Sequence, residues 1–172
     1  MFSPWFLTII AAHMAISTAA PRKFTLKQMG DACEMLVAAE LTLAGVPALK
    51  VPDNWPHYDV IAQPGGLPPQ RVSVKSRTWK RGAAYLEYNC HDEFDWLCAV
   101  ILEGERRRLF VIPREVADNH ARRDQSPKTA HLRYYRVDQV VEIFAQCENN
   151  FGLSYEPSAI ATPAVEVGDD RD

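Results

Sequence analysis

The segment 96–102 constrains the fold more than any other part of the chain, because its residues form an almost unbroken apolar run. A run of this length is typical of a strand that is covered on both faces of a sheet. A tight turn at 103–105 joins the segment 96–102 to a second predicted strand at 106–113. Four more strand-like segments precede 96–102 in the chain, at 46–51, 58–62, 71–76 and 83–89. With the helices described below, these strands predict an α/β (α+β) fold with a mixed central sheet of four to five strands flanked by helices.

Residues 63–70 are rich in glycine and proline and separate two of these short strands. Such a break between two apolar runs favours an antiparallel hairpin of 58–62 with 71–76. Because side chains alternate along a strand, Ser73 and Lys75 should share one face of the second strand, with Val72 and Val74 on the other.

Three segments are predicted to be helical. Residues 25–28 read Thr-Leu-Lys-Gln, a capping-box pattern, and an apolar stripe of helical spacing follows until Gly45. The segments 113–123 and 137–147 are the other two helices. Along the first helix, Glu34 falls on the edge of the apolar stripe, where a carboxylate requires a partner.

The chain has 172 residues, which suits one domain, and 47% of them are hydrophobic. We predict a folded domain at 24–150, between a disordered or apolar N-terminal extension at 1–23 and a disordered acidic tail at 151–172. The extension contains an apolar run and small residues like those of a signal-peptide cleavage site, but no Lys or Arg precedes the run and His13 interrupts it. We interpret it as a loosely packed extension or a start assigned too early, with export as the alternative, and expect a cytoplasmic protein.

The formal net charge of −3 conceals an uneven distribution of charge. From Cys147 onward there are six acids and one arginine, which leaves 16 acids and 18 basic residues in the rest of the chain. The body of the protein is therefore mildly basic, and the overall charge does not exclude a nucleic-acid partner. The four cysteines lack any CxxC spacing, which disfavours zinc and disulfide-rich folds and predicts reduced, mostly buried thiols.

Two short strands each carry a lone charge of opposite sign, Asp59 in one and Lys75 in the other. With Glu34, these residues suit the cleavage of a phosphodiester: carboxylates bind a hard cation such as Mg²⁺, and an ammonium group donates to water or to a charged phosphate oxygen. The simpler interpretation is a buried Asp–Lys ion pair with a structural helix acid. The spacing of these residues alone does not distinguish a catalytic site from a structural ion pair.

The ordered set of segments resembles a known family. The segments 30–45 (GDACEMLVAAELTLAG), 57–62 (HYDVIA), 71–77 (RVSVKSR), 94–101 (FDWLCAVI) and 109–113 (LFVIP) are similar to the PD-(D/E)XK endonuclease superfamily. The resemblance is closest to its small stand-alone branch, which is allied with group I intron homing endonucleases. It spans roughly residues 25–116 and implies a restriction-endonuclease-like core.

The resemblance implies a role for each matched residue. Asp59 would be the metal-binding aspartate, Lys75 the motif lysine and Glu34 the helix acid, with the backbone carbonyl of Val74 as a further ligand for Mg²⁺ or Mn²⁺. The chain departs from the family pattern at Ser73, where the superfamily has an acid and this branch often has glutamine. A hydroxyl is a weaker ligand than a carboxylate, so Ser73 implies one-metal catalysis, replacement by another acid such as Glu87, or lost activity with DNA binding retained.

The expected partner is DNA. Arg71, Arg77, Lys80 and Arg81 gather around the motif strand, and basic side chains there can neutralise phosphates. We therefore predict a metal-dependent DNA endonuclease, a hydrolase that cuts phosphodiester bonds, with a catalytically inactive DNA-binding module on the same fold as the alternative. A domain with one site that cuts both strands would have to act as a homodimer.

Overall fold

The computed structural model describes residues 24–82 and 84–155. The predictions for residues 1–23, and those for the tail after residue 155, lie outside this range. In the described part, no helix is both long enough and apolar enough to cross a membrane. Leu153 is buried, and Phe151 and Tyr155 pack against the core, so the packed domain continues past the predicted boundary at residue 150.

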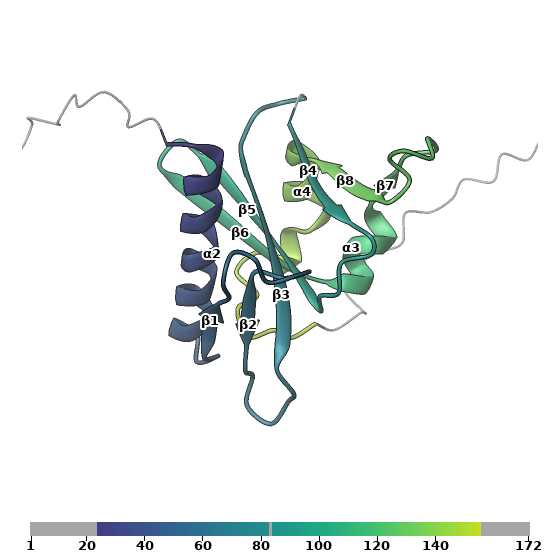
Figure 1. Ribbon diagram of the computed structural model, residues 1–172. Coiled ribbons are helices and arrows are strands. Elements are labelled where there is room, and N and C mark those ends of the chain that lie inside the picture. Colours follow the sequence, from purple (N-terminus) through teal and green to yellow (C-terminus); the bar gives the residue numbers. More distant parts are fainter. Residues whose placement is uncertain (1–23, 83, 156–172) are drawn as a thin grey trace, which may run out of the picture.

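A five-stranded mixed sheet forms the centre of the domain (Figure 1). Its strands are β1 Ala48–Lys50, β2 Val60–Ala62, β3 Gln70–Thr78, β5 Trp96–Glu103 and β6 Arg106–Pro113, in the order β1-β2-β3-β5-β6. β3 and β5 are parallel, and the other neighbouring pairs are antiparallel. The predicted α+β fold with a mixed sheet is confirmed, as are the β2–β3 hairpin and the interior position of β5.

The structure contains a second, smaller sheet that was not predicted from the sequence. The segment predicted at 83–89 forms β4 Tyr85–Asn89, which pairs with β8 Leu132–Arg136, and β8 pairs with β7 Arg122–Arg123. β4 therefore lies outside the central sheet. Because the sequence of β8 mixes arginine and tyrosine and only Tyr135 is buried, β8 has no apolar run from which a strand could be predicted.

The helices cover both faces of the central sheet (Figure 1). α2 Leu26–Leu43 packs on one face, where Val37 and Leu41 meet the buried valines of β2 and β3. The second sheet, α3 Arg114–His120 and α4 Val137–Ile143 cover the other face. β5 is buried on both faces, which explains its almost unbroken apolar sequence.

The two later helices are shorter than predicted. The segment 113–123 is helical only to His120, because Arg122 and Arg123 pair with β8. The segment 137–147 divides into α4 and a 3-10 helix, Ala145–Cys147. All four cysteines are free and three are buried, as the sequence predicts.

The capping box at the start of α2 is confirmed. Thr25 Oγ1 accepts from the Gln28 backbone N–H at 3.1 Å, and the Gln28 side chain accepts from the Thr25 backbone N–H at 2.9 Å. At the other end, Gly45 has a φ of 90°, a conformation that glycine adopts without strain. The two caps set where α2 begins and ends, and its buried stripe, which includes Met29, Cys33, Val37 and Leu41, decides which face meets the sheet.

Candidate active site

The carboxylate of Asp59 is held by the backbone of the neighbouring strand. Asp59 directly precedes β2, and its backbone N–H donates to the Val72 carbonyl at 3.0 Å. Its Oδ2 atom accepts from the Val74 backbone N–H at 2.6 Å and from the Ser73 hydroxyl at 3.4 Å. Two donors from β3 thus set the position of this carboxylate.

Lys75 reaches the same carboxylate. Its Nζ atom lies 3.9 Å from Asp59 Oδ2, and both side chains are about 70% buried, with 30% and 27% of their surface exposed. Ser73 and Lys75 lie opposite Leu97 and Ala99 of β5, on the face that α3 and α4 cover, while Val72 and Val74 face α2. The predicted alternation along β3 is confirmed, and Ser73 is completely buried.

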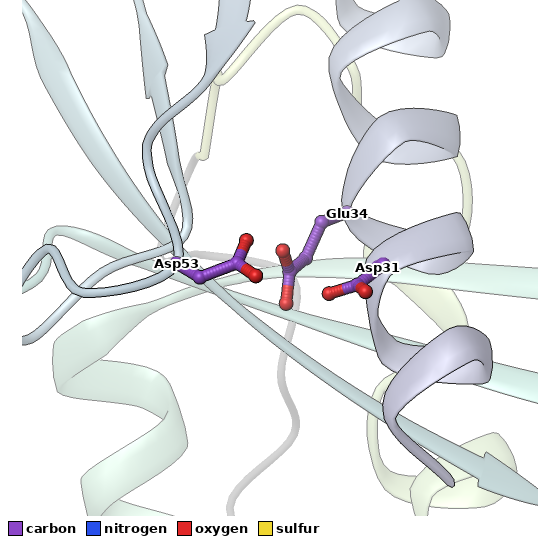
Figure 2. Close-up of side chains that lie close together, drawn as sticks. All are labelled: Asp31, Glu34 and Asp53. Carbon is purple, nitrogen blue, oxygen red and sulfur yellow. The ribbon is translucent and has the colours of Figure 1, made fainter. Parts of the chain in front are cut away.

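Glu34 enters the site from α2 and contacts another lysine. Its Oε2 atom lies 3.0 Å from Lys50 Nζ of β1, and this ammonium group lies 2.6 Å from Asp53 Oδ1. Lys27 joins the network from the first turn of α2, at 2.6 Å from Asp53 Oδ2 and 3.0 Å from Asp31. Figure 2 shows the carboxylates of Asp31, Glu34 and Asp53 side by side, and their oxygens lie within 4.8 Å of one another.

A cavity of about 220 Å³ brings the helix acid and the strand acid together. Glu34 and Asp59 both line it, together with Lys27, Gly30, Asp31, Val51, Pro52, Asp53, Trp55 and Tyr58. Lys75 is connected to this group through its contact with Asp59. Of the three residues singled out in the sequence, Glu34 and Asp59 thus line the same cavity, and Lys75 contacts Asp59 without lining the cavity itself.

The charges of the network reinforce one another. Asp53 and then Glu34 raise the pKa of Lys50 well above its usual range. The ammonium groups of Lys27 and Lys50 lower the pKa of Asp53 to about 2. Asp53 and Asp31 in turn raise the pKa of Lys27. At neutral pH Asp53 is thus ionised, and it lies next to the protonated Lys27 and Lys50.

The donor atoms of the site fit a hard divalent cation. The contacts to Asp59 from described residues all reach Oδ2, so Oδ1 has no protein partner among them. In the ion pair of Glu34, Oε2 lies 3.0 Å from Lys50 Nζ. Carboxylate oxygens with unused lone pairs at one cavity are the ligands that Mg²⁺ and Mn²⁺ bind.

The four basic residues predicted to contact DNA differ in their surroundings. Arg71 donates to both carboxylate oxygens of Asp95, at 3.1 and 3.0 Å, and also pairs with Glu93. Burial alone would raise the pKa of Asp95, but the hydrogen bonds from Arg71 outweigh it and lower that pKa. Asp95 thus holds Arg71 through hydrogen bonds.

The remaining three basic residues lie at and beyond the far end of β3. Arg77 donates from Nε to the Tyr85 carbonyl at 2.8 Å and is exposed. Lys80 and Arg81 follow β3 and are also exposed. On a strand that rises ~3.3 Å per residue, Arg71 and Arg77 lie roughly 20 Å apart, so these basic residues follow the length of β3.

Sequence reasoning missed Lys27, Asp31, Lys50 and Asp53. A signal was available on α2, because Lys27, Asp31 and Glu34 are spaced by four and three residues and therefore share one helix face. Lys50 and Asp53 carry no such signal, since strand β1 and the loop after it reach Glu34 only in the folded chain. Glu87, suggested as a replacement for the missing acid, is exposed on β4 and does not line the cavity.

No protein-family model matches the chain, and no curated protein matches it at a significant level. Among solved structures, the chain is similar to the bacterial homing endonuclease I-Ssp6803I, with 17% identity, a TM-score of 0.47, and a match over 72% of this chain and 95% of the other. It is also similar to Hjc, a Holliday junction resolvase from Archaeoglobus fulgidus, with 14% identity, a TM-score of 0.42, and a match over 65% of this chain and 91% of the other.

Proposed function

We propose that this protein is a Mg²⁺- or Mn²⁺-dependent DNA endonuclease of the PD-(D/E)XK type. One observation carries the proposal: Asp59, oriented by the backbone of the motif strand and contacted by Lys75, lines the same cavity as Glu34. The sequence resemblance assigns roles to the same three residues. A structural Asp–Lys pair would not require a second acid at the same cavity.

Asp59 and Glu34 would hold the cation, with the Val74 carbonyl as a neutral ligand. In a strand the N–H and C=O of one residue point toward the same neighbour, so the Val74 carbonyl faces the side on which its N–H meets Asp59. A bound divalent cation neutralises phosphate oxygens and lowers the pKa of a water ligand. Lys75 would donate to the attacking water or to the charge that develops on the phosphate.

Ser73 has a supporting role in this proposal. Its buried hydroxyl donates to Asp59 Oδ2, so it helps to orient the carboxylate instead of supplying a second acid. Glu87 is absent from the cavity lining, and both oxygens of Asp31 and of Asp53 already contact lysines, so the arrangement favours catalysis with one cation held by Asp59 and Glu34.

DNA would bind along β3. Arg77, Lys80 and Arg81 are exposed beyond the site and would contact phosphates. Arg71 would do so from the other end of the strand, although its guanidinium is already shared with Asp95. Cutting of both strands would need a homodimer, because each chain supplies one such site.

Plasmid cleavage tests this function. Purified protein is incubated with supercoiled DNA and Mg²⁺ or Mn²⁺, beside Asp59→Ala and Lys75→Ala variants of equal purity. We expect nicked or linear DNA with the wild-type chain only. Equal cleavage by all three proteins would reveal a contaminating nuclease and refute the proposal.

The same experiment addresses a second candidate, a DNA-binding module without activity. The observation that favours it is Ser73, because this position lacks the acid that the superfamily uses. DNA whose migration is retarded by all three proteins but that is never cut would support the module.

A further inference from the structure

The ammonium group of Lys50 lies close to three oxygen atoms. Its Nζ atom lies 2.6 Å from Asp53 Oδ1, 3.0 Å from Glu34 Oε2 and 3.4 Å from the Val51 carbonyl. Two of its N–H groups donate to Asp53 Oδ1 and to the Val51 carbonyl, and the ammonium charge also forms the ion pair with Glu34. Only 21% of the Lys50 side chain and 19% of the Glu34 side chain are exposed, and solvent therefore screens this contact less than it would on an open surface.

This contact occupies one oxygen of an acid that is also suited to hold a metal ion. A divalent cation bound at Glu34 and Asp59 would lie close to the positive charge of Lys50, and like charges at such separations repel. Lys50 can release Glu34 without losing its position, because Asp53 and the Val51 carbonyl still hold the ammonium group. The divalent cation can thus replace the Lys50 ammonium group at Glu34 without a rearrangement of β1.

We propose that Lys50 is an internal counter-ion that competes with the divalent cation for Glu34 and so sets the metal affinity of the site. The inference rests on the proposed function, since it takes Glu34 as a metal ligand. Lys50 acts here through Glu34 and is a positioning residue, with no role in the reaction itself.

Lys27 provides a matched control. It carries the same charge and belongs to the same network, but it contacts Asp31 and Asp53 and has no contact with Glu34. Its side chain is 66% exposed. A general effect of positive charge near the cavity would appear in variants of both lysines, whereas competition for Glu34 would appear only in a variant of Lys50.

Calorimetric titration of the full chain with Mn²⁺ tests the inference in the wild type, Lys50→Met and Lys27→Met. We expect Lys50→Met to bind Mn²⁺ at least about tenfold more tightly than the wild type, and Lys27→Met to stay within about threefold. Unchanged or weaker binding by Lys50→Met would overturn the inference, and so would an equal gain in both variants.

A measurement on the wild-type chain covers the case in which Lys50→Met does not fold. The lysines are acetylated with an amine-reactive ester, with and without Mg²⁺, and the extent of labelling at each lysine is read by peptide mass spectrometry. Release from Glu34 should raise the labelling rate of Lys50 by at least about threefold, with little change at Lys27. An unchanged rate at Lys50 would contradict the competition.

Titration of Asp59→Asn separates this inference from the proposed function. If the wild type binds Mn²⁺ no better than Asp59→Asn, the proposed metal site fails and the inference fails with it. If the wild type binds through Asp59 and Lys50→Met shows no gain, only the role of Lys50 is wrong.

Discussion

The carboxylates of the cavity and the carboxylates that pair with arginine elsewhere in the domain are bound in different ways. In the Arg108–Glu148 pair, Nε and Nη2 of one guanidinium each contact a different carboxylate oxygen, at 2.7 and 2.6 Å. Arg71 binds Asp95 in the same two-point fashion. Both oxygens of each acid are therefore occupied.

In the cavity, lysine takes the place of arginine. Lys50 contacts one oxygen of Glu34, and Lys75 approaches one oxygen of Asp59. An ammonium group is a point charge, whereas a guanidinium is a planar fork that matches both oxygens of a carboxylate. The comparison teaches that Arg108 and Arg71 occupy both oxygens of Glu148 and Asp95, whereas the lysines next to Glu34 and Asp59 each lie nearest one oxygen. The other two cavity acids, Asp31 and Asp53, have both oxygens in contact with lysine.

The largest effect should come from removing the charge of a cavity acid. We expect Asp59→Asn to lower the rate of plasmid nicking at least about 100-fold, because a site without this ligand loses several kcal/mol of charge stabilisation in the transition state. The matched control is Glu148→Gln, which removes the same charge from an arginine pair and should keep nicking near the wild-type rate. An equal loss of nicking rate in both variants would show that the cavity acid and the arginine-paired acid do not differ in their importance for cleavage.

Breaking an arginine pair should instead reduce stability. Glu148→Ala leaves Arg108, whose side chain is only 17% exposed, without its partner. We expect the free energy of unfolding to fall by about 2 kcal/mol, measured by urea denaturation. Asp53→Asn, at a half-exposed acid of the cavity network, should leave the denaturation midpoint nearly unchanged. A larger loss in Asp53→Asn than in Glu148→Ala would reverse the comparison.

The pH dependence of stability should reveal the same pair. The hydrogen bonds from Arg108 lower the pKa of Glu148 below its ordinary value of 4.5. An acid with a lowered pKa in the folded state stabilises the fold above its unfolded pKa, and this contribution is lost as the pH falls through the folded pKa. The stability difference between wild type and Glu148→Gln should therefore stay constant down to a pH of about 4.5 and shrink below it. A difference that persists in strong acid would show that the charge of Glu148 is irrelevant.

The smallest effect is expected at Ser73. Its hydroxyl lies 3.4 Å from Asp59 Oδ2, a long contact, while the Val74 N–H holds the same oxygen at 2.6 Å. Ser73→Ala should lower the nicking rate by less than about tenfold and stability by about 1 kcal/mol, judged by the same two assays. A loss as large as that of Asp59→Asn would make Ser73 a catalytic residue.

Much of the fold could be predicted from neighbouring residues. The capping box at Thr25, the apolar run that became β5 and the hairpin of β2 and β3 are confirmed, because each is encoded by residues close together in the chain. The second sheet could not be predicted, since β8 becomes a strand only by pairing with β4. Its mixed arginine and tyrosine sequence has no periodicity of its own.

For the candidate site, the sequence by itself determined which residues are unusual: Asp59 and Lys75 each stand at the end of an apolar run, and Glu34 lies on the edge of a helix stripe. Only the tertiary structure decided their partners. The contacts of Glu34 with Lys50, and of Lys50 with Asp53, join α2, β1 and the loop after β1, and such contacts arise from packing. Periodicity reports the face on which a side chain lies, whereas the partner across that face depends on how distant segments pack together.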